Sequence, residues 1–344
     1  MKLFQRLLVA PAALGLMAPV AVNADTAFES TTTLSGEAVF TVGAADFDAA
    51  ATNEELHMHY AYTLNLDSSF SGSDNLHVGI EAGNTSETNP TSPFQNLDSA
   101  IVGDNSLSVS SLYYSFPVGD IAITGGPLLE AEDLVGVTTS TYSEGLITSA
   151  LPYSQTDAVG AGIGAAYAPD NGFSLSASIL SLDAADATRG INTDTSDDTV
   201  TLAAGFNSDS GFGGGIVYTS SDGDNTGNTN GPAEQSTFGA GVYYNTDDLG
   251  VSVSFDSRDV EATGVETTAF LIGADYEVGP GTAHVGYQTV DVDGDSFLDN
   301  DLFEVAYSFD VNDNVTVTPA FFSQGSSTSD ENDTGMIVES TFSF

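Results

Sequence analysis

The sequence has 344 residues and is strongly acidic: 49 Asp and Glu stand against 4 Lys and Arg, for a formal net charge of −45. A chain with this charge repels phosphate backbones, so nucleic acid is excluded as a partner. Cysteine is absent, which excludes disulfides, thiol catalysis and cysteine-ligated metals. Hydrophobic residues make up 41% of the chain, so the charge does not indicate disorder.

The first 24 residues have the features of a secretory signal peptide. Lys2 and Arg6 form a basic start, and an apolar run over residues 7–22 follows. This run contains helix breakers and is shorter than the ~20 apolar residues that span a bilayer. We expect cleavage after Ala24, which leaves residues 25–344 as the exported chain.

Hydrophobic and small or polar residues alternate after this leader. Leu56, Met58 and Tyr60 share one parity, for example, whereas His57 and His59 take the other. Successive side chains of a strand point to opposite faces, so each alternating segment predicts a strand with one apolar face. Sixteen strands are predicted, at residues 34–42, 56–66, 76–83, 107–117, 120–126, 157–168, 173–182, 199–206, 212–220, 236–244, 249–256, 266–277, 282–290, 302–309, 314–322 and 335–344.

The connections between these strands alternate between short turns and longer polar loops, a plan typical of transmembrane barrels. Short turns follow Leu66, Phe116, Tyr167, Phe206, Tyr244, Tyr276 and Phe309, each with aromatic residues at or beside it. Such aromatics predict a girdle at one lipid–water boundary. We therefore predict an all-β fold, a transmembrane antiparallel β-barrel of about 16 strands over residues 25–344. The alternative is a soluble β-sandwich, in which the apolar faces pack against each other.

The last predicted strand ends at the final residue of the sequence, with Phe342 and Phe344 on its apolar face. This ending resembles the assembly signal of bacterial porins. The opening residues 1–11 resemble the leaders of marine cyanobacterial porins. Many of those carry a cell-wall-binding domain before the barrel; this chain is expected to lack it, because its first strand is predicted from residue 34. The resemblance implies a homotrimer in the lipid outer membrane of a Gram-negative-type cell, folded by the outer-membrane assembly machinery.

The third long loop covers about residues 128–156. In porins of this plan the third loop commonly folds inward and narrows the pore, so the resemblance implies that its acidic residues line the constriction. These residues are Glu130, Glu132, Asp133 and Glu144. The sequence itself shows only a long acidic loop, and the alternative is a loop with solvated carboxylates on the surface.

Four further carboxylates have the parity of the predicted lumen face: Glu37, Glu81, Glu304 and Glu339. Many porins oppose the acidic loop with an arginine cluster, but only Arg189 and Arg258 follow the leader here, both expected in or beside long loops. Carboxylate rings in a pore favour cations, and the net charge concentrates cations at its mouth. We expect a water-filled channel for small hydrophilic solutes and ions, with a preference for cations. The alternative is that the charge serves hydration and solubility alone.

The segment 291–301 resembles a calcium-binding loop, because carboxylates recur at its first, third, fifth and ninth positions. These are Asp291, Asp293, Asp295 and Asp299. Ser296 replaces the usual glycine and Leu302 the bidentate acid, so a plain acidic loop is the alternative. No other cofactor is expected, and no nucleophile–base pair is legible. Two other function classes stay open: a secreted or surface adhesin-like acidic protein that binds divalent ions, and an outer-membrane barrel enzyme.

Overall fold

The computed structural model describes residues 31–46, 55–85, 97, 99–101, 103, 105–142, 158–193, 196–223, 234–261, 263–293, 301–325 and 332–344. Within these residues the chain forms sixteen strands. They are β1 (Thr31–Asp46), β2 (His57–Ser69), β3 (Asn75–Gly83), β4 (Ser108–Val118), β5 (Ile121–Glu130), β6 (Val159–Tyr167), β7 (Phe173–Ser181), β8 (Asp198–Asn207), β9 (Phe212–Ser221), β10 (Gln235–Asn245), β11 (Leu249–Val260), β12 (Val265–Val278), β13 (Gly281–Val292), β14 (Leu302–Asn312), β15 (Val315–Gly325) and β16 (Asn332–Ser343).

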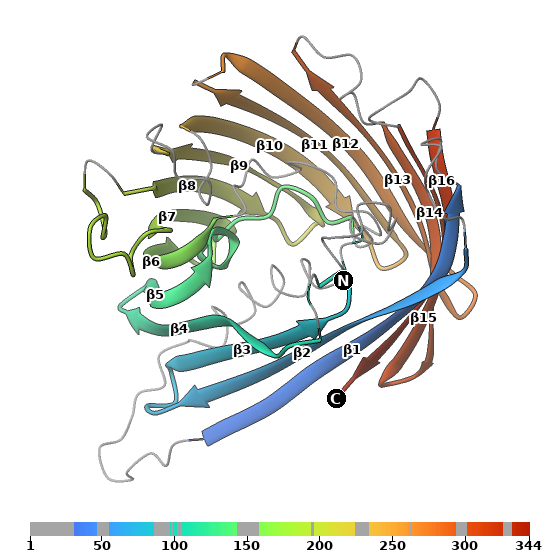
Figure 1. The fold of residues 1–344 in the computed structure, drawn as a ribbon, viewed down its shortest axis with the longest axis horizontal. Helices are drawn as coiled ribbons and strands as arrows, with labels where there is room; N and C mark the ends of the chain where they lie inside the picture. Colours follow the sequence, from blue (N-terminus) through green and yellow to red (C-terminus); the bar gives the residue numbers. More distant parts are fainter. Residues whose placement is uncertain are drawn as a thin grey trace.

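The strands form one closed antiparallel barrel in which each strand pairs with its neighbours in sequence (Figure 1). β1 and β16 close it, in a register that runs from Glu37 opposite Ser343 to Asp46 opposite Thr334. Closure satisfies both edges of the sheet, so no strand edge stays unpaired around the ring. The predicted barrel is confirmed, and the alternative of a β-sandwich is wrong.

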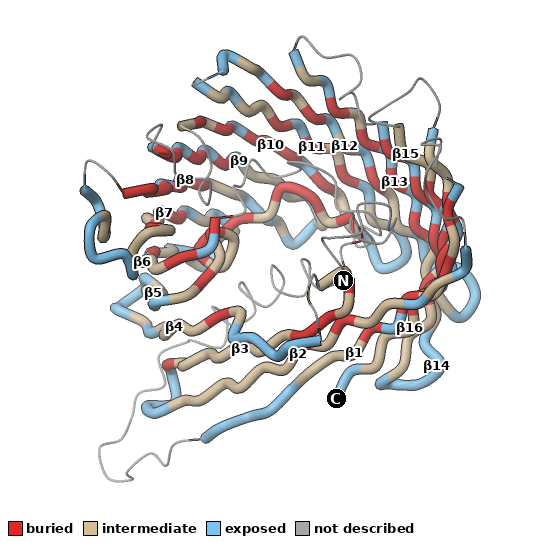
Figure 2. Tube along the Cα trace, in the orientation of Figure 1, coloured by how far each residue is buried: buried red, intermediate tan, exposed pale blue. Residues whose placement is uncertain are grey.

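The apolar side of the barrel faces outward. In β11, Val251 and Phe255 are exposed, whereas Ser252, Ser254 and Asp256 between and beside them are buried. The same alternation of buried and exposed residues runs along most strands in Figure 2. An apolar exterior around a polar interior is the arrangement that a lipid bilayer requires of a barrel.

Seven short turns join the strands in pairs, each where the sequence predicts it. Aromatic rings gather beside them. Phe173 and Phe206 lie 4.9 Å apart between ring centres, and Phe212 and Tyr244 lie 4.6 Å apart. Phe173, Phe206 and Phe212 are also exposed. These pairs bridge neighbouring strands on the outer face and form part of the predicted girdle.

β5 is longer than predicted. The sequence predicts its end at residue 126, but the strand continues through Pro127 to Glu130. The register shifts between Gly126 and Leu129, and a bulge of this kind accommodates a proline that cannot donate to the ladder. A short 3-10 helix, η2 (Ala131–Leu134), follows directly. Among the residues that the structure describes, no helix has the length and hydropathy to cross a membrane.

Candidate channel constriction

The chain turns into the barrel directly after β5. We call residues 131–142 the inner segment. At its start the side chain of Asp133 accepts a hydrogen bond from the backbone N–H of Glu130, which caps η2. Leu134 then packs over Gly164, on the lumen face of β6. The inner segment therefore begins inside the barrel, against its wall.

The middle of the inner segment lies on β7, β8 and β9. The backbone N–H of Gly136 donates to Ser176 Oγ at 3.0 Å. Val135 and Val137 form a buried cluster with Ala203 and Val217, which are lumen-facing residues of β8 and β9. Apolar contacts and a wall hydrogen bond thus fix the path of the chain.

The end of the inner segment reaches the far side of the barrel. Ser140 Oγ lies 2.7 Å from Ser252 Oγ of β11, and the Tyr142 hydroxyl donates to Glu304 Oε1 of β14 at 2.6 Å. In Figures 1 and 2 this segment, green after β5 and mostly buried, crosses the inside of the barrel. Residues 131–142 therefore line the wall from β6 to β14.

Small wall residues make this close contact possible. A Cβ at Gly241 would overlap the carbonyl oxygen of Thr139, and a Cβ at Gly273 would overlap the ring of Tyr142. The lumen-facing glycines that contact the inner segment are Gly164, Gly205, Gly215, Gly241, Gly273 and Gly286. These glycines lie on β6, β8, β9, β10, β12 and β13. On the two strands between them, β7 and β11, the contacts to the segment come from Ser176 and Ser252. Small side chains therefore leave room for the segment along the wall.

Three of the four predicted constriction carboxylates gather where the inner segment begins. Glu130 ends β5, so it belongs to the strand and not to the loop as expected, because the bulge extends β5. Glu132 and Asp133 lie in η2, and all three residues are half-buried. Glu144 lies outside the described residues. That these carboxylates set the selectivity of a pore stays a prediction.

The four carboxylates of lumen parity all occur on the inner face, but in two different environments. Glu304 and Glu339 are only 3% and 8% exposed. Glu304 accepts the hydroxyl of Tyr142, and Glu339 accepts hydroxyls from Thr41, at 3.1 Å, and from Ser99. Hydroxyl donors from two inward loops, together with Thr41 of β1, therefore cover this pair.

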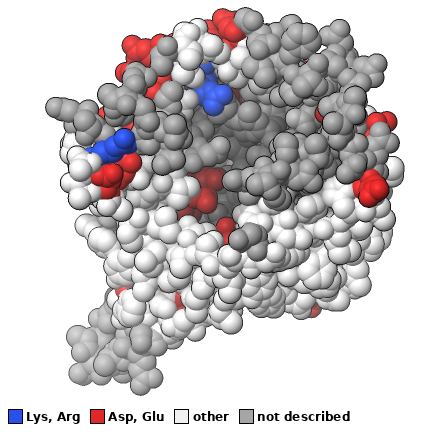
Figure 3. All heavy atoms as spheres, viewed as in Figure 1, with Lys and Arg blue, Asp and Glu red and all other residues white. Residues whose placement is uncertain are grey.

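Glu37 and Glu81 are half-buried instead. Both lie directly opposite Thr63 across the sheet, Glu37 on β1 and Glu81 on β3. Opposed residues of antiparallel strands share a face, so the three side chains form one row on the inner wall. We call Glu37, Thr63 and Glu81 the acidic row. Figure 3 shows carboxylates inside the hollow of the barrel.

The two arginines after the leader lie apart. Arg189, in the loop between β7 and β8, pairs with Asp183 at 3.2 Å. Arg258 was expected in or beside a loop, but β11 extends past it, and it faces the lumen between Thr237 and Thr267. In Figure 3 the two cations lie at separate places around the hollow. Among the described residues, the two arginines do not form a basic cluster.

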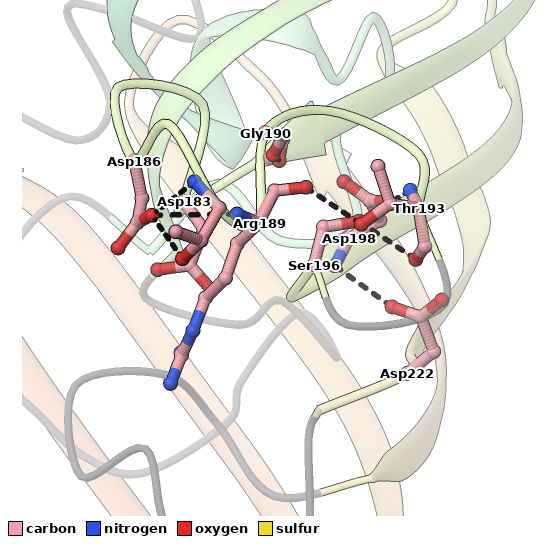
Figure 4. A network of polar contacts seen from close by, with 10 residues as sticks. Asp183, Asp186, Arg189, Gly190, Thr193, Ser196, Asp198 and Asp222 are labelled. Carbon is pink, nitrogen blue, oxygen red and sulfur yellow. Dashed lines mark hydrogen bonds and ion pairs between the residues drawn. The ribbon is translucent and has the colours of Figure 1, made fainter.

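The loop around Arg189 is held by its own carboxylates (Figure 4). Hydrogen bonds from the side chain and backbone of Thr188 lower the pKa of Asp186. Nearby, Ser196 donates to Asp198 at 2.6 Å, and the backbone N–H of Asp198 donates to Asp222 at 2.7 Å. Arg189 thus pairs with Asp183 in a loop that makes several hydrogen bonds of its own.

The sequence model of the Gram-negative porin family matches residues 10–332 of this chain. The chain belongs to this family. Its barrel is similar to solved structures of a Rh. blastica porin mutant (TM-score 0.59, 14% identity, covering 91% of this chain and 100% of that one). It is also similar to a loop deletion mutant of OmpT, an outer membrane protein of Vibrio cholerae (TM-score 0.60, 14% identity, 91% and 99%). No curated protein sequence matches significantly.

Membership of the porin family and the closed barrel place the chain in the outer membrane and favour a channel over an enzyme. At identities this low, the solved structures support the fold alone. The short turns correspond to the periplasmic end of such barrels, and the longer loops to the outside.

The candidate calcium loop is only partly described. Asp291 is the penultimate residue of β13 and is exposed, and the backbone N–H of Asp293 donates to the carbonyl of Glu266 at 2.9 Å. Asp295 and Asp299 lie outside the described residues. Within the described part of the chain, no group of three His, Asp or Glu side chains is placed to hold a metal.

The sequence did not reveal two polar pairs on the lumen wall. His77 Nδ1 lies 2.9 Å from Asp67 Oδ1, and His284 Nδ1 lies 2.8 Å from Asp275 Oδ1. Each pair spans one hairpin at directly opposed positions. The signal was available, since in each hairpin an aspartate and a histidine of lumen parity flank a short turn.

Proposed function

We propose that this chain forms a water-filled channel for passive diffusion of small hydrophilic solutes and ions, and that the channel prefers cations. The observation that carries the proposal is the acidic row. Glu37 and Glu81 stand on the inner wall, half-buried, without a cluster of arginines across from them.

The preference follows from the fields at this wall. Carboxylates beside low-dielectric protein attract cations more strongly than the same groups in bulk water. Of the four basic residues, Arg258 is the lumen-facing one among the described residues, and it lies two positions from Asp256 on the same face of β11. The carboxylates therefore attract cations into the channel. Because the basic residues do not form a cluster opposite them, the electric field across the pore is weak.

Reversal potentials across a planar bilayer in a KCl gradient test this preference. The wild-type channel should favour K⁺, and Glu37→Gln combined with Glu81→Gln should lower the ratio of cation to anion permeability. Asp247→Asn is the matched control, because it removes one exposed carboxylate from the turn between β10 and β11. An anion preference in the wild type would refute the proposal.

Assembly is proposed on the same basis. The backbones of Phe344 and Gly36 exchange two hydrogen bonds, and the ring of Phe344 lies 6.2 Å from the ring of Tyr62. Phe344 therefore contributes to the contact between β16 and β1 that closes the barrel. We propose that Phe342 and Phe344 form the signal for the outer-membrane assembly machinery, and that the barrels associate as homotrimers. Phe344→Ser should lower the yield of heat-modifiable barrel, and crosslinking should show three subunits.

Three smaller predictions remain separate from the channel itself. Mass spectrometry of the exported protein should find its N-terminus after Ala24. Calorimetric titration with Ca²⁺ tests the loop of Asp291 and Asp293.

A closer relation to marine cyanobacterial porins is also proposed, on the resemblance of residues 1–11. The exposed apolar belt of the closed barrel supports a membrane protein over a secreted adhesin.

A further inference from the structure

An apolar patch lies on the lumen face, although the wall of a water-filled channel is expected to be polar. Phe322 and Ile337 are each 2% exposed and point inward from β15 and β16. Their outward neighbours, among them Phe321 and Met336, are exposed. We call the patch the apolar seat; it consists of Ala45, Leu302, Ala306, Ala320, Phe322 and Ile337.

Two described residues of the second long loop, Leu97 and Ala100 between β3 and β4, cover part of the apolar seat. Leu97 is 3% exposed and belongs to the same buried cluster, and Ala100 packs against that cluster. Leu97 therefore lies inside the barrel, on the wall formed by β14, β15, β16 and β1. Burial of apolar surface on both sides favours this docked position over one in water.

Polar contacts hold the loop in the same place. Ser99 donates to Glu339 of β16, and the backbone N–H of Gly103 donates to the carbonyl of Thr85 at 2.9 Å. Ile101 packs closely on Gly83 of β3: a Cβ added at Gly83 would overlap the carbonyl oxygen of Ile101. Between Leu97 and Gly103, the described residues of the loop therefore contact the wall at β16 and the end of β3.

The two inward loops meet on neighbouring strands. Glu304, which accepts the hydroxyl of Tyr142, lies directly opposite Phe322 of the apolar seat across β14 and β15. The inner segment therefore ends at β14, next to the strand that carries Phe322 of the apolar seat. Described residues of two loops thus dock on adjacent parts of the wall.

We propose that the part of the second long loop around Leu97 and Ser99 is a second constriction element of the channel, docked by Leu97 in the apolar seat. This rests on the proposed channel function and adds Leu97 and Ser99 to the residues that set the size of solute admitted.

Cysteine labelling tests the docking, because the chain has no cysteine of its own. In the full-length protein in liposomes, Leu97→Cys should react with a membrane-impermeant maleimide at least about tenfold more slowly than Leu107→Cys. Leu107, in the same loop, is 68% exposed and serves as the matched control. Equal labelling rates would overturn the proposal.

Single-channel recording tests the constriction. Leu97→Ser should raise the conductance and admit larger neutral polyethylene glycols, whereas Leu107→Ser should leave both unchanged. Heat-modifiable gel mobility shows whether the barrel is folded; if Leu97→Ser fails to fold, the same recording on Leu97→Cys replaces it. A folded variant at position 97 with unchanged conductance and solute limit overturns the second constriction alone. A wild-type protein that never conducts would overturn the channel as well.

Discussion

Parity along a strand determines which face a residue occupies, but not what covers it. All four carboxylates of lumen parity lie on the inner face, as their sequence pattern indicates. Glu304 and Glu339 are nevertheless buried, because Tyr142 and Ser99 approach them from loops 162 and 240 residues away in sequence. Contacts over such separations depend on the closed barrel, so periodicity could not separate these two from Glu37 and Glu81.

Asp74 shows a residue-scale role that its position in a turn does not suggest. Its carboxylate accepts hydrogen bonds from the side chain of Ser69 and from the backbone N–H groups of Phe70 and Ser71. The hydroxyl of Tyr114 on β4 donates to it as well. Burial alone would raise the pKa of Asp74, but these hydrogen bonds outweigh burial and lower it. One carboxylate thus joins the turn between β2 and β3 to the next strand.

Asp74→Ala should lower the free energy of unfolding by ~1–3 kcal/mol, because it leaves several donors without their acceptor. A carboxyl with a lowered pKa stabilises the fold while ionised. Its contribution is therefore complete above about pH 4 and is lost as pH falls through the folded-state pKa. Urea titration of the barrel in detergent, followed by gel mobility, measures both effects.

The comparison of the wild type with Asp74→Ala isolates the contribution of this group. The stability difference between the two proteins should be largest near neutral pH and should shrink under acid conditions. Asp247→Asn, in the turn between β10 and β11, controls for loss of a turn carboxylate. A stability difference that grows as pH falls would contradict the assigned role.

At the scale of elements, strands were predictable and loop paths were not. Each of the sixteen predicted strands is present, because an outer face in lipid and an inner face in water impose period-two alternation on each one. β5 was cut short because Gly125, Gly126 and Pro127 resemble a turn by composition, whereas here they accompany a bulge. Composition alone does not distinguish these two uses of glycine and proline.

The sequence contains a signal for the path of the inner segment, but hydrophobic alternation alone does not reveal it. Gly205, Gly215 and Gly241 share lumen parity on three consecutive strands, and each contacts the inner segment. Glycines recurring at matched register indicate close approach of another backbone. A similar signal exists for the apolar seat, since Phe322 and Ile337 are large and apolar at lumen parity. Apolar residues on the wrong face of a barrel strand point to an inward loop.

Gly241→Val should displace the inner segment from the wall. The new side chain would overlap the backbone of Thr139, and overpacking of this kind costs ~1–3 kcal/mol. The strands pair without the segment, so the barrel should still fold, while single-channel current should rise and become noisier. Planar-bilayer recording measures both quantities.

Ala240→Val provides the control, because Ala240 is the neighbour of Gly241 on the same strand and faces outward. This variant should conduct as the wild type does. Equal currents in all three proteins would show that the inner segment does not limit conduction.

At the scale of the whole molecule, the negative charge falls into two zones that respond differently to salt. The loop end carries carboxylates in water. There, a hydrogen bond with Glu261 raises the pKa of Glu234, and repulsion from Asp222 adds to it. The acidic row lies on the inner wall, on the path that the proposed channel gives to ions. The net charge of −45 was evident in the sequence, whereas this division depends on the fold.

The cation preference should therefore fall with salt in two steps. The Debye length is ~10 Å at 0.1 M and ~3 Å at 1 M, so concentrated salt screens the remote loop carboxylates but not the nearby acidic row. The wild type should keep part of its cation preference at 1 M KCl, because Glu37 and Glu81 line the wall of the proposed channel and contact ions at short range. Reversal potentials in gradients centred on the two concentrations measure this.

The double variant Glu37→Gln with Glu81→Gln separates the two zones. Its permeability ratio should approach one at 1 M KCl, where the remaining loop charges are screened, yet exceed one at 0.1 M, where they still act across the mouth. If the double variant and the wild type instead lose selectivity together as salt rises, the acidic row contributes nothing, and the loop carboxylates alone select the ion.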